Sequence, residues 1–515
     1  MLPAQTLLPA AVLVLLQCTA CERGEPPGAD RRPANPVVVG TPPTAAPSPA
    51  SMLVPAEAAR IGTVEDNLPF VPDGTRIAST AWRTWVYTDT GPKRTRYGYL
   101  RVGSILDARG PEIRNEGCAG GWYRINPRGF VCIGMGATLD TRHPSVVASA
   151  VRPLRKQSLP YLYALTGAVP PLLYFRLASR QEMETSEGTD LFGRVATFRE
   201  RLRLGPLKDL LETVGPPPDF LSQTRKLEKP YGTKQGLHFS AHAGRAAPET
   251  GFSIARVFDW EGRLFGMTTE LELIGLERTK LVVPSEFRGV ELGEERTLPV
   301  AFVEARYAQK YVANERGELV ASGAFQHREA LVLTGATRPG GMLEARGGVW
   351  APRSILRLVP ARTNFPSMAT GDRKWIDVSI NDQTLVAYSG RRPVYATLVS
   401  TGRGGLGDPE TEQATVRGTF MIHQKEVSST MDGEEDSAAD SYALRDVPFV
   451  QYFHKGFALH GTYWHDEFGR IRSHGCVNLS PIDAAWLFEW TDPVVPSDWH
   501  GVLNKDRGTV VYVRP

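Results

Sequence analysis

Short runs in which apolar and polar residues alternate recur through most of the chain. One run spans 374–380, a turn follows at 381–383, and two more runs span 384–388 and 395–400. Successive side chains of a strand point to opposite faces of the sheet, so this period of two predicts a β-meander. The 50 glycines and 40 prolines add turns and favour short strands. The pattern therefore predicts a mainly β protein.

The first region of this kind spans 78–140 and contains a hairpin. Residues 126–129, between two apolar runs, have Asn, Pro and Gly at the positions that type I turns prefer. Cys118 and Cys132 flank this hairpin. They either form a disulfide, which would contribute about 3 kcal/mol to stability, or remain two separate buried thiols.

The middle of the chain is less uniform. Residues 141–250 form a partly helical segment, with the clearest helical pattern at 199–214. Prolines and a glycine interrupt the apolar run 159–175, which predicts burial within the protein and not a transmembrane helix. Strands resume over 251–365, where the pattern of the first β region recurs. This part is either a second module of the same kind or another β-rich segment.

The N-terminus has the pattern of an export signal. An apolar stretch at 7–16 is too short to span a bilayer permanently. The sequence CTAC at 18–21 resembles a lipobox, whose last cysteine is lipidated. We expect a signal peptide over 1–21 with lipidation of Cys21, and a plain secretory signal is the alternative. Residues 22–70 are rich in proline and alanine and are expected to form a linker.

Composition narrows the class of protein. A length of 515 residues predicts several domains. The formal net charge of +3, with no basic stripe that carries interleaved aromatics, argues against a nucleic-acid partner. Five cysteines, grouped as two, two and one, fit an exported protein with one disulfide and one functional thiol. No CxxC pair recurs, which argues against a zinc site.

The single cysteine has the surroundings of a nucleophile. The sequence SHGCVN at 473–478 places a histidine and a glycine directly before Cys476, and HGT at 460–462 supplies another histidine. A nearby imidazole or helix N-terminus favours the thiolate. Gly475 leaves space for a substrate carbonyl and free N–H groups for an oxyanion. Ser480-Pro481 then predicts a helix that begins just after the cysteine and runs through Trp490.

Two other interpretations of Cys476 stay open. The thiol is either an inert buried side chain or one ligand of a zinc ion. The compact ligand spacings of zinc sites are absent, which argues against the second. The zinc ligands would be His460, His465, Asp466, His474 and Cys476.

The HGT sequence at 460–462 and the SHGCVNL sequence at 473–479 resemble the signature of the L,D-transpeptidase (YkuD-type) catalytic domain. Members of this family are cysteine enzymes of bacterial peptidoglycan. The resemblance covers 373–515 and implies a β-sandwich-like catalytic domain at the C-terminus. Residues 78–140 resemble the bacterial SH3-like domain, a small barrel often found beside wall enzymes. We therefore expect SH3-like β modules and a partly helical segment ahead of the catalytic domain.

The resemblance also implies roles for individual residues. Cys476 is the expected nucleophile and His460 the expected proton donor and acceptor. The backbone carbonyl of Gly461 would orient the His460 ring, and the N–H of Gly475 would contribute to an oxyanion hole. No metal and no cofactor is implied. The residues expected to hold the loop or to contact the substrate are Ser473, His474, Asn478, His454 and Phe457.

The implied reaction is transpeptidation of peptidoglycan stem peptides through a thioester, with release of D-alanine. The acyl acceptor would be an amine of diaminopimelate, of a lysine in an anchored protein, or of a free D-amino acid. With water as acceptor, the same site is an L,D-carboxypeptidase or endopeptidase. A non-catalytic wall-binding lipoprotein is the alternative from another class.

The expected location is the periplasm, with the chain tethered to a membrane through Cys21. Within the catalytic region, residues 425–446 carry several acidic side chains. They either form a flap over the cleft or a solvated loop.

Overall fold

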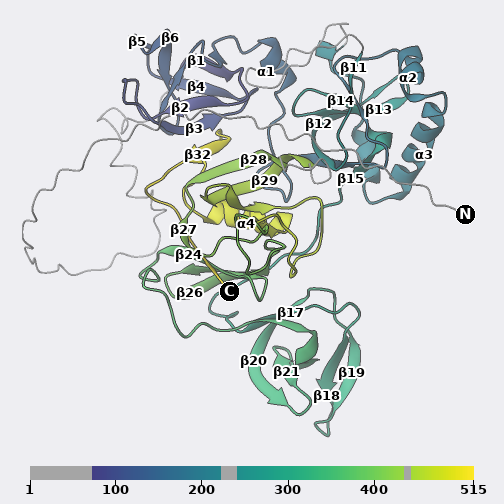
Figure 1. Ribbon diagram of the computed structural model, residues 1–515, viewed down its shortest axis with the longest axis vertical. Helices are drawn as coiled ribbons and strands as arrows, with labels where there is room; N and C mark the ends of the chain where they lie inside the picture. Colours follow the sequence, from purple (N-terminus) through teal and green to yellow (C-terminus); the bar gives the residue numbers. More distant parts are fainter. Residues whose placement is uncertain (1–71, 222–240, 434–441) are drawn as a thin grey trace, which may run out of the picture. The chain divides into compact units, whose positions relative to one another are not determined.

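The computed structural model describes residues 72–221, 241–433 and 442–515 (Figure 1). Strands greatly outnumber helices in these residues, which confirms the predicted mainly β class. Within this part of the chain, no helix is long and apolar enough to cross a membrane. The predicted signal peptide, the lipidation site Cys21 and the linker at 22–70 lie outside the described residues.

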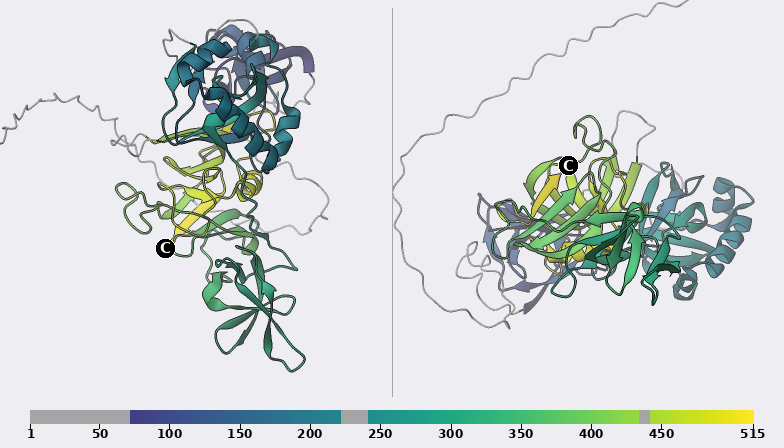
Figure 2. Two further views of the ribbon diagram at one scale, coloured as in Figure 1. Left: turned by 90° about the vertical axis from the view of Figure 1, so that its right-hand side faces the viewer. Right: turned by 90° about the horizontal axis from the view of Figure 1, so that it is seen from below.

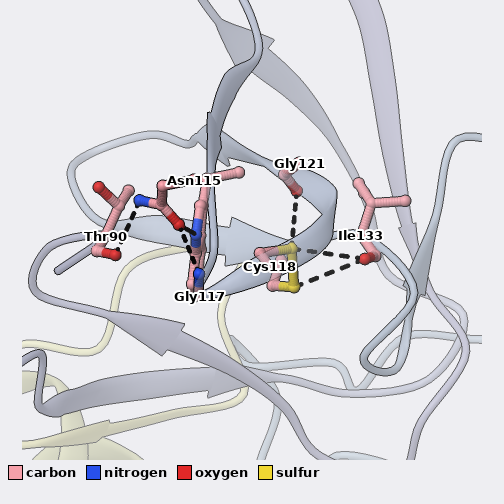
Figure 3. The surroundings of a disulfide bond; sticks show 8 residues. Thr90, Asn115, Gly117, Cys118, Gly121 and Ile133 are labelled. Carbon is pink, nitrogen blue, oxygen red and sulfur yellow. Dashed lines mark hydrogen bonds between the residues drawn. A yellow bond between two sulfur atoms is a disulfide. The ribbon is translucent and has the colours of Figure 1, made fainter. Parts of the chain in front are cut away.

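The first β region contains the predicted hairpin. Strands β6 (Cys118–Arg124) and β7 (Phe130–Cys132) pair antiparallel, with Trp122 opposite Cys132. A disulfide joins Cys118 to Cys132, with Cα atoms 5.8 Å apart (Figure 3). It packs against Trp122 in a small apolar core. The other strands here are β1 (Pro72–Ser79), β2 (Thr84–Tyr87), β3 (Arg96–Leu100), β4 (Ile105–Arg109), β5 (Ile113–Asn115) and β8 (Ala137–Thr138).

The apolar run 159–175 lies in two strands, β9 (Leu162–Thr166) and β10 (Leu172–Tyr174). Tyr163 of β9 and Tyr174 of β10 are buried in the protein. The burial predicted for this run is therefore found, in sheet and not in helix.

The helix predicted at 199–214 is found in part, because the α-helix begins earlier and ends at residue 204. Helix α3 spans Leu191–Leu204, and a short 3-10 helix follows at Lys208–Thr213. The α-helix ends before Gly205-Pro206, because proline lacks an N–H and disfavours helical geometry in the residue before it. The other helices of this segment are α1 (Pro144–Ala148) and α2 (Arg180–Glu187).

The segment boundary expected at residue 250 falls at the start of a long strand. Strand β12 (Thr250–Trp260) pairs with β9, with Gly251 opposite Leu165, and with β13 (Arg263–Thr268). Its pairing with β9 joins residues before and after position 250 in one sheet. The remaining strands of this sheet region are β11 (His242–Arg245), β14 (Leu273–Gly275) and β15 (Thr279–Leu281).

Seven strands between residues 300 and 359 form a separate sheet around its own apolar core (Figure 2). The order is β19-β18-β22-β21-β20-β17-β23. The strands are β17 (Val300–Val303), β18 (Gln309–Ala313), β19 (Leu319–Ala324), β20 (Ala330–Arg338), β21 (Met342–Ala345), β22 (Val349–Pro352) and β23 (Leu356–Val359).

The C-terminal region contains the predicted meander. Strands β24 (Lys374–Ser379), β25 (Thr384–Ser389) and β26 (Arg392–Leu398) pair antiparallel in sequence order. They belong to a six-stranded sheet, in the order β16-β26-β25-β24-β33-β27. The other strands of that sheet are β16 (Val290–Glu291), β27 (Gly418–Met421) and β33 (Val510–Arg514).

A second group of strands shares an apolar core with this sheet. The helix α4 (Pro481–Trp490) has the predicted bounds, and the Ser480 hydroxyl accepts the N–H of Asp483 at its N-terminus. In Figure 1 this helix lies beside β28 and β29. The strands are β28 (Gln424–Gly433), β29 (Tyr442–His454), β30 (Phe457–Gly461), β31 (Val477–Leu479) and β32 (Gly501–Leu503).

The earlier segments extend this second group of strands. Strand β3 pairs with β32, and β12 pairs parallel with β29, with Gly251 opposite Leu444. Backbone pairing of this kind makes the segments before residue 283 part of the structure that surrounds the C-terminal strands.

Candidate active site

Two parallel strands bring the predicted residues together. Strands β30 and β31 pair with Leu459 opposite Val477 and His460 opposite Asn478. The first pair is fully buried in the apolar core. Because side chains alternate along a strand, His460 and Asn478 point to the other face. Cys476 lies two residues before Asn478, and it lines the same cavity as both.

Cys476 is half-buried, and its thiol lies 3.7 Å from the carbonyl oxygen of Gly456. Burial raises the pKa of this thiol to about 11. The cysteine is not at the helix N-terminus, because β31 separates it from the Ser480 cap. The sequence suggested two features that could lower the pKa of Cys476, a nearby imidazole and a helix N-terminus. Because of this separation, the helix does not lower it.

His460 is buried, and its Nδ1 lies 3.1 Å from the carbonyl oxygen of Gly461. This is the contact that the resemblance implied. Nδ1–H donates to that carbonyl, so Nε2 of the neutral ring carries no proton and can accept one. Burial lowers the pKa of His460 to about 4, and the Gly461 carbonyl only partly offsets it. The ring is therefore neutral at neutral pH.

Hydrogen bonds within the loop hold the cysteine in place. The Ser473 hydroxyl accepts the N–H of Gly475 at 3.1 Å and donates to the carbonyl of Cys476 at 2.5 Å. The Thr415 hydroxyl donates to the carbonyl of Gly475 at 2.7 Å. The N–H of Gly475, expected in an oxyanion hole, is thus engaged by Ser473 in this structure.

Gly475 is required by its surroundings. Its φ of +131° lies in a region that side chains disfavour, and a Cβ there would lie 2.8 Å from Cε1 of Phe457. Phe457 therefore packs against the loop itself. His454 contacts the rings of Phe420 and Phe457, with centroids 4.7 Å and 6.3 Å apart. The described residues that line the cavity at Cys476 do not include His454 or Phe457.

The cavity has a volume of about 1270 Å³. It brings together five of the residues singled out in the sequence, and it adds neighbours that the motif does not contain. The residues from the C-terminal region include His460, Ser473, His474, Cys476, Asn478, Tyr452, Trp464, His465, Arg403 and Arg472. Those from the earlier segment are Leu165, Thr166, Gly167, Ala168, Pro170, Pro248 and Glu249.

His465 is a site residue that the sequence analysis considered only as a zinc ligand. Its Nδ1 accepts the N–H of Glu467, and its Nε2 lies 3.0 Å from the side-chain amide of Asn478. Burial and the nearby Arg472 lower the pKa of His465 to about 4. The neutral ring therefore supports Asn478 within the cavity. No group of three or more His, Cys, Asp or Glu residues in the described ranges could hold a metal ion.

Thr415 is a second residue that the sequence analysis did not name as part of the site. Besides its bond to Gly475, its hydroxyl accepts the N–H of Gly402 at 2.9 Å. Nothing in the local sequence indicates these contacts, because the loops meet only in the folded structure.

The C-terminal part of this chain is similar to known proteins. Residues 373–513 match the model of the YkuD family, the L,D-transpeptidase catalytic domain. YciB of Bacillus subtilis strain 168, which is named as an L,D-transpeptidase, is 24% identical over 141 residues. That match covers 22% of this chain and 59% of YciB. The chain thus spans about three fifths of the length of this relative.

Solved L,D-transpeptidase structures are also similar to part of this chain. An L,D-transpeptidase from Mycobacterium smegmatis is 23% identical, with 36% of this chain and 82% of that chain covered and a TM-score of 0.23. One from Stackebrandtia nassauensis is 28% identical, with 30% and 62% covered and a TM-score of 0.20. Residues 373–513 of this chain are thus similar to the L,D-transpeptidase catalytic domain of the YkuD family, by their match to the family model.

Proposed function

We propose that this protein is a cysteine-dependent L,D-transpeptidase that acts on peptidoglycan stem peptides. The observation that carries the proposal is the pairing of β30 with β31. It places His460, with Nδ1 held by the Gly461 carbonyl, in the same cavity as Cys476. A thiol, a base with a free nitrogen and a cavity large enough for peptides are the requirements of acyl transfer.

In the first half-reaction, Nε2 of His460 takes the thiol proton as Sγ of Cys476 attacks the carbonyl of the third stem residue. The N–H of Cys476 is the better candidate donor to the oxyanion, since Gly475 donates within the loop. The C–N bond to D-alanine then breaks, and the leaving nitrogen takes the proton from His460. A thioester on Cys476 remains.

In the second half-reaction, an acceptor amine attacks the thioester carbonyl. His460 takes a proton from the attacking nitrogen, the C–N bond forms and the C–S bond breaks. The sulfur then recovers the proton from His460, and the free thiol is restored. No charge is held on the resting pair, because burial favours the neutral forms of both groups.

The proposal is tested by incubating the full-length mature protein with disaccharide-tetrapeptides and identifying products by chromatography and mass spectrometry. Cys476→Ala is the control. Cross-linked products that the variant does not form would support transpeptidation. Tripeptide without cross-links would support the L,D-carboxypeptidase alternative. A lack of any cysteine-dependent product would contradict both.

The remaining expectations belong to the proposal as well. We infer that Cys21 carries a lipid that tethers the chain in the periplasm, and that the β region at 78–140 acts as an SH3-like wall-binding module. Labelling of the wild type, but not of Cys21→Ala, with a fatty-acid analogue tests the first. Binding of purified wall by a chain that lacks 373–515 tests the second.

A further inference from the structure

One wall of the catalytic cavity comes from outside the matched domain. Residues 165–170 and 248–249 contribute to the cavity that holds Cys476, although the family match begins only at residue 373. The turn after β9 and the residues just before β12 supply this wall. The sequence that performs the chemistry is therefore not the only sequence that a substrate meets.

Backbone pairing and ring packing hold this wall against the strands that carry the catalytic residues. Gly251 lies opposite Leu444 of β29, and its backbone lies so close to Tyr463 that a Cβ would collide with the ring. On its other side Tyr463 stacks on Tyr163 of β9, with centroids 4.2 Å apart. Tyr463 lies three residues after His460 in the chain. Glu249, two residues before Gly251, is thus held at a defined place relative to the base.

A buried charge network reinforces this mounting. The carboxylate of Asp446 on β29 accepts hydrogen bonds from Ser253 and Thr269, both at 2.6 Å, and from Arg101 Nη2 at 3.0 Å. Burial would raise its pKa, but Arg101 and the two hydroxyl groups hold the pKa of Asp446 well below its ordinary range. The carboxylate is therefore ionised, and it joins β12 to the strands of the cavity.

The charges around the cavity are unevenly placed. Arg403 and Arg472 line it from the C-terminal region, whereas Glu249 is the carboxylate among the described lining residues. Glu249 is exposed, has a φ of +55°, and forms no ion pair with any described residue. A positive φ is uncommon in a residue other than glycine. At Glu249, this unusual backbone conformation sets the direction of the side chain at the rim of the cavity.

We propose that Glu249 binds the acyl acceptor by attracting its protonated amine into the cavity. This rests on the proposed function. Stem peptides that donate the acyl group carry carboxylates, which suit Arg403, whereas Arg472 already pairs with Glu467 at 2.9 Å. An acceptor amine is cationic when it enters the cavity, and the Glu249 carboxylate is complementary to that charge. The ammonium group then releases one proton to solvent, and the neutral amine attacks the thioester as in the second half-reaction. The segment outside the family domain would then select amines over water as the acceptor.

The test separates acylation from transfer. Full-length wild type and Glu249→Gln are acylated with a disaccharide-tetrapeptide, and the thioester is followed by intact mass. The thioester is then offered a cationic amine, Nα-acetyl-lysine amide, or hydroxylamine, which is uncharged at neutral pH. Glu261→Gln is the matched control, because Glu261 is also an exposed glutamate with positive φ in the same segment and lies outside the cavity lining.

We expect Glu249→Gln to lower the rate of transfer to the lysine amide by about fivefold, the upper range for an exposed charge contact. Acylation, hydrolysis and transfer to hydroxylamine should be unchanged, and the difference should shrink in high salt. Glu249→Lys should lower transfer further.

Unchanged transfer to the lysine amide would overturn the inference, and so would an equal loss with hydroxylamine or a slower acylation. If the wild type forms no thioester, the proposed function itself fails, and the inference fails with it.

Discussion

Two groups of titratable side chains in this protein have different charge states at neutral pH, although burial acts on both. At the cavity, burial raises the pKa of Cys476 to about 11 and lowers that of His460 to about 4, so both are uncharged at neutral pH. Around Asp446, Arg101 and hydroxyl donors overcome the same burial, and the carboxylate keeps a pKa well below its ordinary range. Burial by itself does not decide charge; a fixed partner of opposite charge does.

The charge state of each of these two groups suits its role in the protein. The Asp446 network joins three segments and has to keep its charges to keep its hydrogen bonds. Among the described residues, the polar partners of Cys476 and His460 are backbone groups, and no charged side chain shifts the pKa of either. Their proton can therefore move when a substrate carbonyl arrives, and the resting site stores no ion pair.

The largest expected effect is on the neutral pair. His460→Gln should slow thioester formation by about 10²–10⁴-fold, the usual range for loss of a general base. Its residual rate should rise with pH towards the thiol pKa of about 11, because only hydroxide then removes the proton. Intact-mass kinetics with a tetrapeptide donor measure this.

The matched control for that variant is His454→Gln, because the His454 ring lies against Phe420 and does not line the cavity. A residual rate in His460→Gln that does not depend on pH would contradict the account of a protonated, neutral thiol.

Removal of the Asp446 charge should have a large effect on the free energy of unfolding. Asp446→Asn leaves Arg101 buried without its counter-charge, which typically costs about 3–5 kcal/mol of unfolding free energy. Denaturant unfolding measures it. Asp498→Asn is the control, since its ion pair with Arg152 at 2.9 Å is exposed and should contribute less than about 1 kcal/mol. Equal effects of the two variants would refute the comparison.

Stability should fall in mild acid because of the neutral histidines. His460 in the folded state titrates near pH 4, and in the unfolded state near 6.5, so its contribution is present above pH 6.5 and lost as pH falls towards 4. The shift corresponds to about 3 kcal/mol. His465 and His500, with pKa values lowered to about 4 and about 3, add to the effect.

Unfolding free energies of wild type and His460→Gln, measured from pH 7.5 to 4, test this sign. The variant should lose less stability than the wild type over that range. Asp446 should contribute almost no slope above about pH 5, because its carboxylate is ionised in both the folded and the unfolded state, and it should add to the loss only as pH approaches 4. A variant that matches the wild-type slope would rule out a buried neutral His460.

The smallest expected effect concerns the loop. Thr415→Val removes the bonds to the Gly402 N–H and the Gly475 carbonyl, at a cost of about 1–3 kcal/mol. Thioester formation should slow several-fold because the Gly475 carbonyl loses its donor. Thermal unfolding and acylation kinetics measure both, with the exposed Thr419→Val as control. Unchanged acylation would show that Ser473 alone positions the loop.

Much of the architecture was predictable because its signals are local. Alternation predicted the meander at 374–400, turn residues predicted the hairpin at 126–129, and the Ser480-Pro481 cap predicted helix α4. The helix at 191–204 was misplaced because the charged, apolar pattern continues past Gly205-Pro206, where the α-helix ends. The boundary expected at residue 250 falls at the first residue of the strand at 250–260, whose pairing with β9, about 90 residues earlier in the chain, leaves no local signal.

The site divides in the same way. Cys476, His460 and the Gly461 carbonyl stand within two short motifs, so their types and spacing indicate the chemistry. Thr415 and Glu249 lie 61 and 227 residues before Cys476 in the numbering, and no periodic pattern connects them to it. Only the pairing of β12 with β29 brings Glu249 to the cavity, and only the meeting of separate loops brings Thr415 to the carbonyl of Gly475.

The sequence by itself determined which atoms are available for reaction: a thiol, an imidazole and a glycine loop before a capped helix. Tertiary structure decided their state and their company. Burial without a counter-charge made Cys476 and His460 neutral, and β31 kept the thiol away from the helix N-terminus. The protonation of a group and the wall it faces depend on everything that packs around it, and that is set by contacts between segments distant in the chain.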